Sequence, residues 1–141
     1  MDLTIKIENA ILNIRVAVLI KGANGYLFEK SKNDYIFCVG GRIKVNESSL
    51  DAASREVEEE LNFKTDKFKL KGIVENFYQN TEGNVHEICF VYEAEEVFSD
   101  IVPPEFVEVS VSDVGNFDVR PKVMADFIVD RSGDFKHVVS K

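Results

Sequence analysis

Four glutamates crowd one short stretch of the chain, residues 55–61. At about 100° per residue on a helix, Glu56, Glu59 and Glu60 share one patch, whereas Glu58 points away from it. Like charges one helical turn apart cost about 0.2–0.5 kcal/mol, and anions near a helix C-terminus also oppose the helix dipole. Carboxylates arranged in this way can converge on a hard divalent cation such as Mg2+, which prefers oxygen ligands.

The loop before this helix decides between a site and a solvated acidic face. A charge run on a helix is more often a solvated face. Residues 40–47, however, follow a predicted strand and precede the helix, and their two glycines permit close approach of the backbone to an ion or a phosphate. The combination of loop and helix favours a site.

The spacing of the loop and helix residues resembles the Nudix box. Gly41, Glu47 after five residues, and residues 55–63 after seven more match its pattern of Gly, Glu and Arg-Glu-hydrophobic-any-Glu-Glu-any-Gly-hydrophobic. Asn62 replaces the final Gly, at a helix end where Asn also tolerates the left-handed conformation. Five charged positions and one Gly recur at this spacing by chance on the order of once in a million sites or less. The match is strict over residues 41–63, and the order of elements resembles the family over most of the chain.

The resemblance implies a hydrolase that cleaves a phosphoanhydride bond of a nucleoside diphosphate linked to another group, by attack of water on phosphorus. It implies that Glu56, Glu59 and Glu60 bind Mg2+, with Mn2+ as the alternative, and that the Gly41 carbonyl adds a ligand. The predicted catalytic residues are Arg55, Glu56, Glu59 and Glu60. Metal ions held there would neutralise the phosphate oxygens and activate the water.

Two further points follow from the resemblance. Glu47 is expected to pair with Arg55 and so to orient the loop against the helix. The general base stays open between Glu56 and a carboxylate on a distant loop.

Substrate contacts are expected from residues outside the helix. Phe77 and Tyr78 could stack on a base and His86 could contact a phosphate, although strand aromatics more often belong to a core and such a His is more often a surface residue. The candidates for substrate binding are Arg42, Glu75, Phe77, Tyr78 and His86.

The elements that must position these residues can be read from periodicity and turn residues. A helix is expected over residues 50–61, capped by Ser48 and with Leu50, Ala53, Val57 and Leu61 on its apolar stripe, and a second one from Pro121 to about residue 128. Strands are expected at residues 3–7, 15–20, 26–29, 35–39, 68–76, 87–94, 107–111 and 137–140.

The early strands are expected to form consecutive antiparallel pairs, and residues 79–84 a long hairpin loop. The fold implied by the resemblance is an α/β/α sandwich with a mixed sheet, the two helices lying on opposite faces.

Length and composition bound the remaining possibilities. A chain of 141 residues predicts one domain over residues 1–141. The net charge of −8 opposes binding to duplex nucleic acid and to anionic membranes. No apolar run is long enough to cross a membrane, the N-terminus is unlike a signal peptide, and Cys38 and Cys89 lie in apolar runs, so a cytoplasmic protein is expected.

Three functions compete at this point. The leading one is a hydrolase that acts on a small nucleoside-diphosphate-type substrate. The alternative is a catalytically silent Nudix-like module that senses a nucleotide, but a pure binder need not retain three mutually repelling carboxylates. A merely structural acidic helix does not explain Gly41 and Glu47 at their spacing. A homodimer is compatible with all three.

Overall fold

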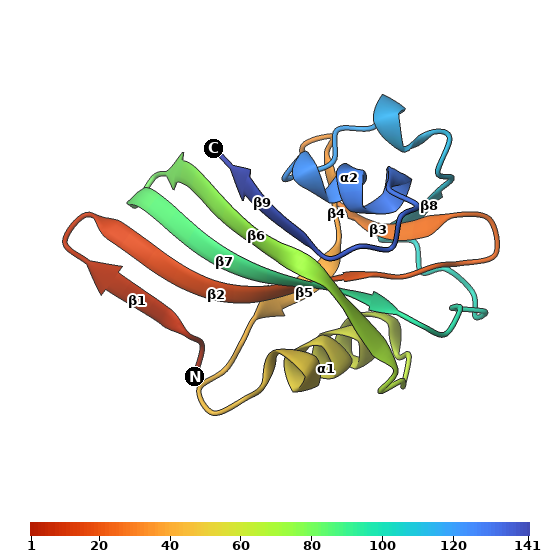
Figure 1. The fold of residues 1–141 in the computed structure, drawn as a ribbon, viewed down its shortest axis with the longest axis horizontal. Helices are drawn as coiled ribbons and strands as arrows, with labels where there is room; N and C mark the ends of the chain where they lie inside the picture. The colour runs from red at the N-terminus through yellow and green to blue at the C-terminus, as the bar shows by residue number, and fades with distance from the viewer.

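The computed structural model describes residues 1–141 and is built around a six-stranded mixed sheet (Figure 1). Its strands run in the order β1-β2-β7-β6-β9, and β5 pairs with the same edge of β2 as β1 does. The β2–β7 and β6–β9 pairs are parallel and the others antiparallel. The strands are β1 (Thr4–Ile7), β2 (Ala10–Leu19), β5 (Val39–Arg42), β6 (Phe68–Asn80), β7 (Gly83–Ala94) and β9 (Lys136–Ser140).

A second, three-stranded sheet corrects the predicted pairing of the early strands. β3 (Tyr26–Lys30) lies between β4 (Ile36–Phe37) and β8 (Phe106–Val109), and it meets the chain just after β2 at an isolated bridge between Lys21 and Tyr26. The prediction of consecutive antiparallel pairs was therefore wrong for β2 and β3. The reason is that both edges of β2 are already paired. One edge pairs with β1 and β5, and the other forms a ten-residue ladder with β7.

The hairpin between β6 and β7 is tighter than predicted. Both strands extend into the segment expected to be loop, and only Thr81 and Glu82 separate them. Gly83 follows with φ of +123°, a conformation that glycine adopts without a steric penalty. The long hairpin loop predicted at residues 79–84 is thus replaced by extended strands.

Two helices lie on opposite faces of the large sheet, and the predicted α/β fold with a mixed sheet is confirmed (Figure 1). They are α1 (Ser49–Leu61) and α2 (Val123–Val129), and a short 3-10 turn, η1 (Val114–Asn116), precedes α2. Pro121 stands two residues before α2 and not in its first turn. Its carbonyl accepts a hydrogen bond from Met124 N at 3.0 Å, so Pro121 heads a tight turn that leads into the helix.

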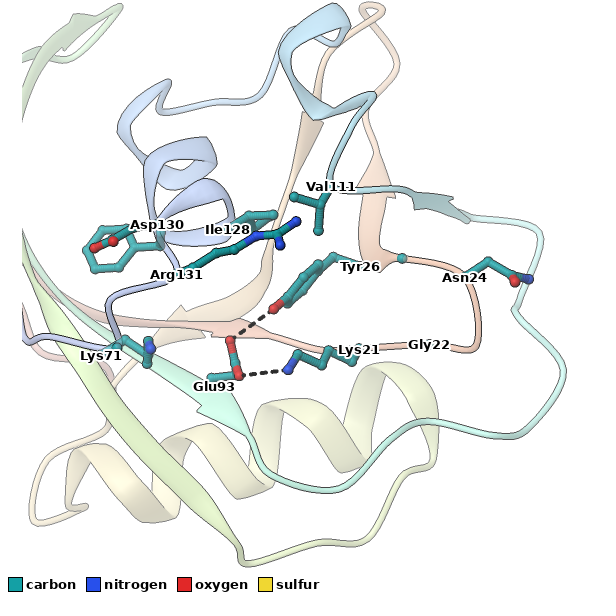
Figure 2. A pocket seen from close by; sticks show the side chains of 13 residues that line it. Lys21, Gly22, Asn24, Tyr26, Lys71, Glu93, Val111, Ile128, Asp130 and Arg131 are labelled. Atoms are coloured by element: carbon teal, nitrogen blue, oxygen red, sulfur yellow. Dashed lines mark hydrogen bonds and ion pairs between the residues drawn. The ribbon is translucent and has the colours of Figure 1, made fainter.

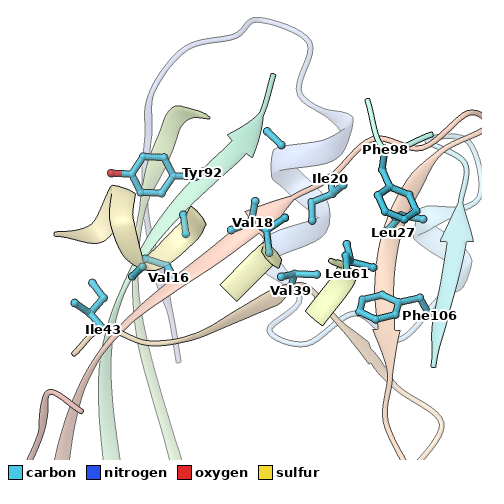
Figure 3. Close-up of a cluster of buried hydrophobic side chains, with 14 residues drawn as sticks. Val16, Val18, Ile20, Leu27, Val39, Ile43, Leu61, Tyr92, Phe98 and Phe106 are labelled. Carbon is cyan, nitrogen blue, oxygen red and sulfur yellow. The ribbon is translucent and has the colours of Figure 1, made fainter. Parts of the chain in front are cut away.

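The core has two parts because β2 is covered on both faces. Val16, Val18 and Ile20 point toward α1 and belong to a cluster of 14 buried residues, shown in Figure 3. Ala17 and Leu19 point the other way, into a second cluster that includes residues of α2. The unbroken apolar run of β2 is typical of a strand buried on both sides. Leu50, predicted on the buried stripe of α1, is instead 41% exposed, and Ala52 takes its place in the core.

None of the helices is long and apolar enough to cross a membrane.

Candidate active site

Helix α1 begins and ends where polar side chains or a permissive backbone satisfy its free groups. The Ser48 hydroxyl accepts a hydrogen bond from Asp51 N at 3.1 Å, as an N-cap should. Asn62 adopts φ of 52° and ψ of 35°, and its N–H donates to Glu58 O at 2.9 Å. Both predicted caps are confirmed. They fix the length of a helix whose last two turns carry the three glutamates of the predicted metal site.

Arg55 ties the preceding loop to the helix. Its Nε donates to Glu47 Oε2 at 2.7 Å and its Nη2 to Glu47 Oε1 at 2.9 Å, and Nη2 also donates to the Arg42 carbonyl at 3.2 Å. Glu47 Oε1 accepts a further bond from Lys44 N. The hydrogen bonds from Arg55 hold the pKa of Glu47 down at about 2, so this carboxylate stays charged. The Glu47–Arg55 contact implied by the resemblance is present.

Glu56 and Glu60 lie against the two glycines of β5. A Cβ atom on Gly41 would overlap the Glu56 carboxylate, and Gly40 N donates to Glu60 Oε2 at 3.3 Å. Burial raises the pKa of Glu56. Burial, together with the charges of Glu29 and Glu56, raises the pKa of Glu60 to about 8. Two carboxylates are therefore held at the backbone of β5 in surroundings that disfavour their negative charge.

The side chains do not form a ready metal cage. No group of three or more His, Cys, Asp or Glu side chains is arranged to hold an ion. Arg55 Nη1 instead donates to Glu56 Oε1 at 2.9 Å and to Glu59 Oε2 at 3.4 Å. The donors nevertheless fit a hard divalent cation, because they are carboxylate oxygens and because a cation would offset the burial and the repulsion that raise the pKa of Glu60.

Glu29 is a fourth carboxylate at this place, and sequence reasoning missed it. It lies on β3, and its charge is the largest contribution after burial to the raised pKa of Glu60. Nothing in the local pattern of residues 26–30 distinguishes it from a solvent-facing strand residue. Only the packing of β3 against β5 brings it near α1.

Glu87 is the centre of a polar network on the large sheet, also missed from sequence. It is only 6% exposed. Its Oε2 accepts hydrogen bonds from Tyr78 OH at 3.1 Å and Asn13 Nδ2 at 3.2 Å, and lies 3.7 Å from Arg15 Nη1, while Asn76 Nδ2 donates to Oε1 at 3.5 Å. A buried carboxylate that satisfies this many partners is a fixed part of the sheet.

The network reaches toward the carboxylate helix through two arginines. Arg15 and Arg42 are directly opposite each other across β2 and β5. Burial and the Glu87 carboxylate raise the pKa of Tyr78, and both arginines oppose that rise, so both guanidinium groups lie near this hydroxyl. Arg15 opposes the rise in the pKa of Glu56 in the same way. The structure thus places Tyr78 in one polar network with Glu87 and Arg15, and joins Arg42 to Arg55 of α1 through its backbone carbonyl.

The other three substrate candidates point to the other face of the sheet from Arg42 and Tyr78, the face on which Phe90 and Tyr92 pack toward α1. Glu75 and Phe77 alternate with Tyr78 along β6, so their side chains point away from it. Phe77 packs against His86, with ring centroids 4.3 Å apart, and Glu75 Oε2 lies 2.6 Å from His137 Nε2. The structure shows no contact between these three residues and the glutamates of α1, and their part in substrate binding stays a prediction.

Residues 12–127 match the family model of the NUDIX domain. This chain belongs to the Nudix family. It is a Nudix hydrolase, an enzyme that acts on phosphoanhydride bonds. A comparison with curated proteins found no sequence match.

Solved structures of Nudix proteins share the fold. A MutT protein from Bacillus halodurans superposes with a TM-score of 0.72 at 19% identity, covering 89% of this chain and 86% of its own. A MutT protein from Methanosarcina mazei Go1 gives 0.68 at 24% identity, with coverages of 88% and 94%. An ADP-ribose pyrophosphatase from Streptococcus suis gives 0.59 at 13% identity, with coverages of 91% and 98%. At these identities the likeness establishes the fold.

Proposed function

We propose that this Nudix hydrolase uses a divalent cation, Mg2+ or Mn2+, held by Glu56, Glu59 and Glu60, to hydrolyse a nucleoside diphosphate linked to another group. The observation that carries the proposal is the placement of Glu56 and Glu60 against the backbone of Gly40 and Gly41. Carboxylate oxygens and a closely approached backbone are the donors that a hard cation needs. Nudix hydrolases generally use divalent metals, which agrees with this assignment.

The residues of the chain have separate tasks in this proposal. Arg55 and Glu47 hold the loop that follows β5 against α1. The Gly41 carbonyl adds a ligand for the cation. A bound cation would supply charge neutralisation on the phosphate oxygens and would activate water. The general base stays open between Glu56 and a carboxylate from another element. Glu29, which lies beside Glu60, is the carboxylate that the structure adds to that choice.

The positive charges of Arg15 and Arg42 support an anionic substrate. Like charges directly opposite on neighbouring strands are unfavourable, and Arg15 and Arg42 are placed in that way beside the network of Glu87. Arg42 forms no ion pair through its guanidinium, which leaves it free to meet a substrate phosphate. Tyr78, whose hydroxyl donates to Glu87, adds an aromatic side chain beside Arg15.

The proposed substrate class rests on the fold together with the positive charges of Arg15 and Arg42. One structural neighbour is named an ADP-ribose pyrophosphatase. ADP-ribose is a nucleoside diphosphate linked to a sugar. We propose a small substrate of this general type, with the whole of residues 1–141 acting as a single domain. The cytoplasmic location and a homodimer stay predictions from the sequence.

The test is turnover of a panel of nucleoside-diphosphate derivatives with Mg2+ or Mn2+ by the wild type and by Glu59→Gln and Glu60→Gln. Because a metal ion supplies several kcal/mol of transition-state stabilisation, each variant should lose at least about 100-fold in kcat/KM. Glu58→Gln is the matched control, since Glu58 lies on the other side of α1, 3.9 Å from Lys64, and should keep full activity.

Two outcomes would contradict the proposal. Turnover that neither variant reduces would remove the glutamates from the reaction. A nucleotide that binds tightly and is never cleaved would favour the sensor.

A further inference from the structure

A second pocket lies on the α2 side of the large sheet, away from the carboxylate helix. Its volume is about 470 Å3, within the range of small-molecule sites. The lining comes from the loop between β2 and β3, from β6 and β7, and from α2 and the turn after it (Figure 2). No residue of α1 or β5 takes part, so this pocket is separate from the proposed active site.

The charges in the pocket do not cancel. Lys21 Nζ lies 3.6 Å from Glu93 Oε2, which neutralises both groups. Asp130, the other anion, pairs with Lys136 at 3.0 Å. Lys71 and Arg131 also line the pocket, and neither forms an ion pair. Two uncompensated cations therefore border one cavity, in a protein whose net charge is −8.

Lys71 lies at a β-bulge of β6 on the rim of the pocket. The register of β6 against β7 shifts between Leu70, which is opposite Tyr92, and Gly72, which is opposite Val91. Lys71 is thus the extra residue with no partner across the ladder. Bulges of this kind re-aim a side chain and are frequent next to functional sites.

Arg131 stands in a turn that Asp130 and Ser132 stabilise. Asp130 Oδ1 accepts a hydrogen bond from Ser132 N and Asp130 Oδ2 one from the Ser132 hydroxyl, both at 3.0 Å. Gly133 continues the turn with φ of +75°. The bonds from Ser132 and Lys136 lower the pKa of Asp130 to about 2, so the turn persists over the physiological pH range. Figure 2 shows Arg131 reaching from this turn over the pocket toward Tyr26.

The rest of the lining offers a surface for an organic group. Tyr26 donates its hydroxyl to Glu93 Oε1 at 3.2 Å, which fixes the orientation of its ring. Phe127 and Ile128 of α2 and Val111 add apolar atoms. The pocket therefore combines two free cations with an ordered, partly apolar wall.

We propose that this pocket binds a small phosphate monoester, its phosphate held by Lys71 and Arg131 and its organic part against Tyr26 and Ile128. A phosphate monoester carries a charge of about −1.5 to −2 at neutral pH, which two cations can balance. A monocarboxylate would leave one of the cations uncompensated. The planar fork of the arginine suits bidentate binding of phosphate oxygens.

The test is an NMR titration of backbone amides in the metal-free protein with EDTA present, using phenyl phosphate, inorganic phosphate and benzoate as probes. Phenyl phosphate should bind saturably with a Kd of about 1 mM or tighter and should shift the amides of Gly22, Gly72 and Gly133. Inorganic phosphate should shift the same amides more weakly, and benzoate should bind at least about tenfold more weakly.

Variants separate the pocket from general charge effects. Lys71→Gln and Arg131→Gln should each weaken phenyl phosphate about tenfold, the loss expected for one charge-assisted hydrogen bond, whereas Lys71→Arg should keep binding. Lys32→Gln removes an exposed cation outside the pocket and should change nothing. Absence of saturable shifts, shifts centred on Gly40 and Gly41, equal binding of benzoate, or an equal effect of Lys32→Gln would each overturn the proposal.

Discussion

The pKa values of two carboxylates near α1 are shifted in opposite directions. The difference distinguishes a structural carboxylate from one suited to bind a metal ion. Glu47 accepts two hydrogen bonds from Arg55, and its pKa falls to about 2. Glu60 is half-buried beside Glu29 and Glu56, and its pKa rises to about 8. The first arrangement stabilises the fold on its own. The second is unfavourable until a cation arrives, which is the behaviour expected of a ligand rather than of a structural ion pair.

Glu47→Gln should lower the free energy of unfolding at pH 7 by about 1.5–3 kcal/mol, because it removes hydrogen bonds between charged partners. The pKa of Glu47 is lowered from 4.5 to about 2, so its contribution is complete above pH 4.5 and disappears as the pH falls toward 2. Urea unfolding of both proteins across this range measures the difference. A difference that stays constant down to pH 2 would contradict the assignment, and Glu58→Gln serves as the control.

Among the helices and strands, the features that depend on residues adjacent in sequence could be predicted. The caps of α1 are local signals, and Ser48 and Asn62 act as expected. The pairing of β2 was not predictable in this way, since its partners are far along the chain. Leu50 shows the same limit on a small scale: it fits the helical stripe, yet it is 41% exposed, whereas Ala52 and Ala53 of the same turn are buried.

The same distinction holds for the residues of the candidate site: those close in sequence were predicted, and those brought together by strand pairing were not. The box residues are contiguous, so their spacing was sufficient to place them together. Arg15 and Glu87 come from separate strands and meet only through the parallel pairing of β2 with β7. One signal was present for Glu87, a charged residue at the start of the predicted strand 87–94, but a charge in a strand is usually solvent-facing. Its burial became visible only with the structure.

The two glycines of β5 should respond differently to alanine. A Cβ on Gly40 would overlap the backbone carbonyl of Val16, which cannot move without breaking the sheet. Gly40→Ala should therefore cost about 1–3 kcal/mol of stability. A Cβ on Gly41 meets only the end of the Glu56 side chain, which can turn away. Gly41→Ala should keep most of the stability and lose most of the metal-dependent activity.

Denaturant unfolding and kcat/KM of both variants check this prediction. Equal loss of stability in Gly40→Ala and Gly41→Ala would show that the close approach to Glu56 is not the important contact. Full activity of a folded Gly41→Ala would remove Glu56 from the position proposed for it.

For the whole molecule, the net charge of −8 and the crowding around Glu60 predict a link between stability and Mg2+. A cation that binds only the folded state stabilises it by about 2.7 kcal/mol at 100 times its Kd. Wild-type Tm should therefore rise by several degrees with Mg2+, beyond the effect of NaCl at equal ionic strength. Because the raised pKa means that the fold disfavours ionisation of Glu60, Glu60→Gln should raise the Tm of the metal-free protein above pH 4.5 and abolish the Mg2+ response. Glu58→Gln should show neither change. A Mg2+ response that survives in Glu60→Gln would assign the stabilisation to general charge screening instead of a bound ion.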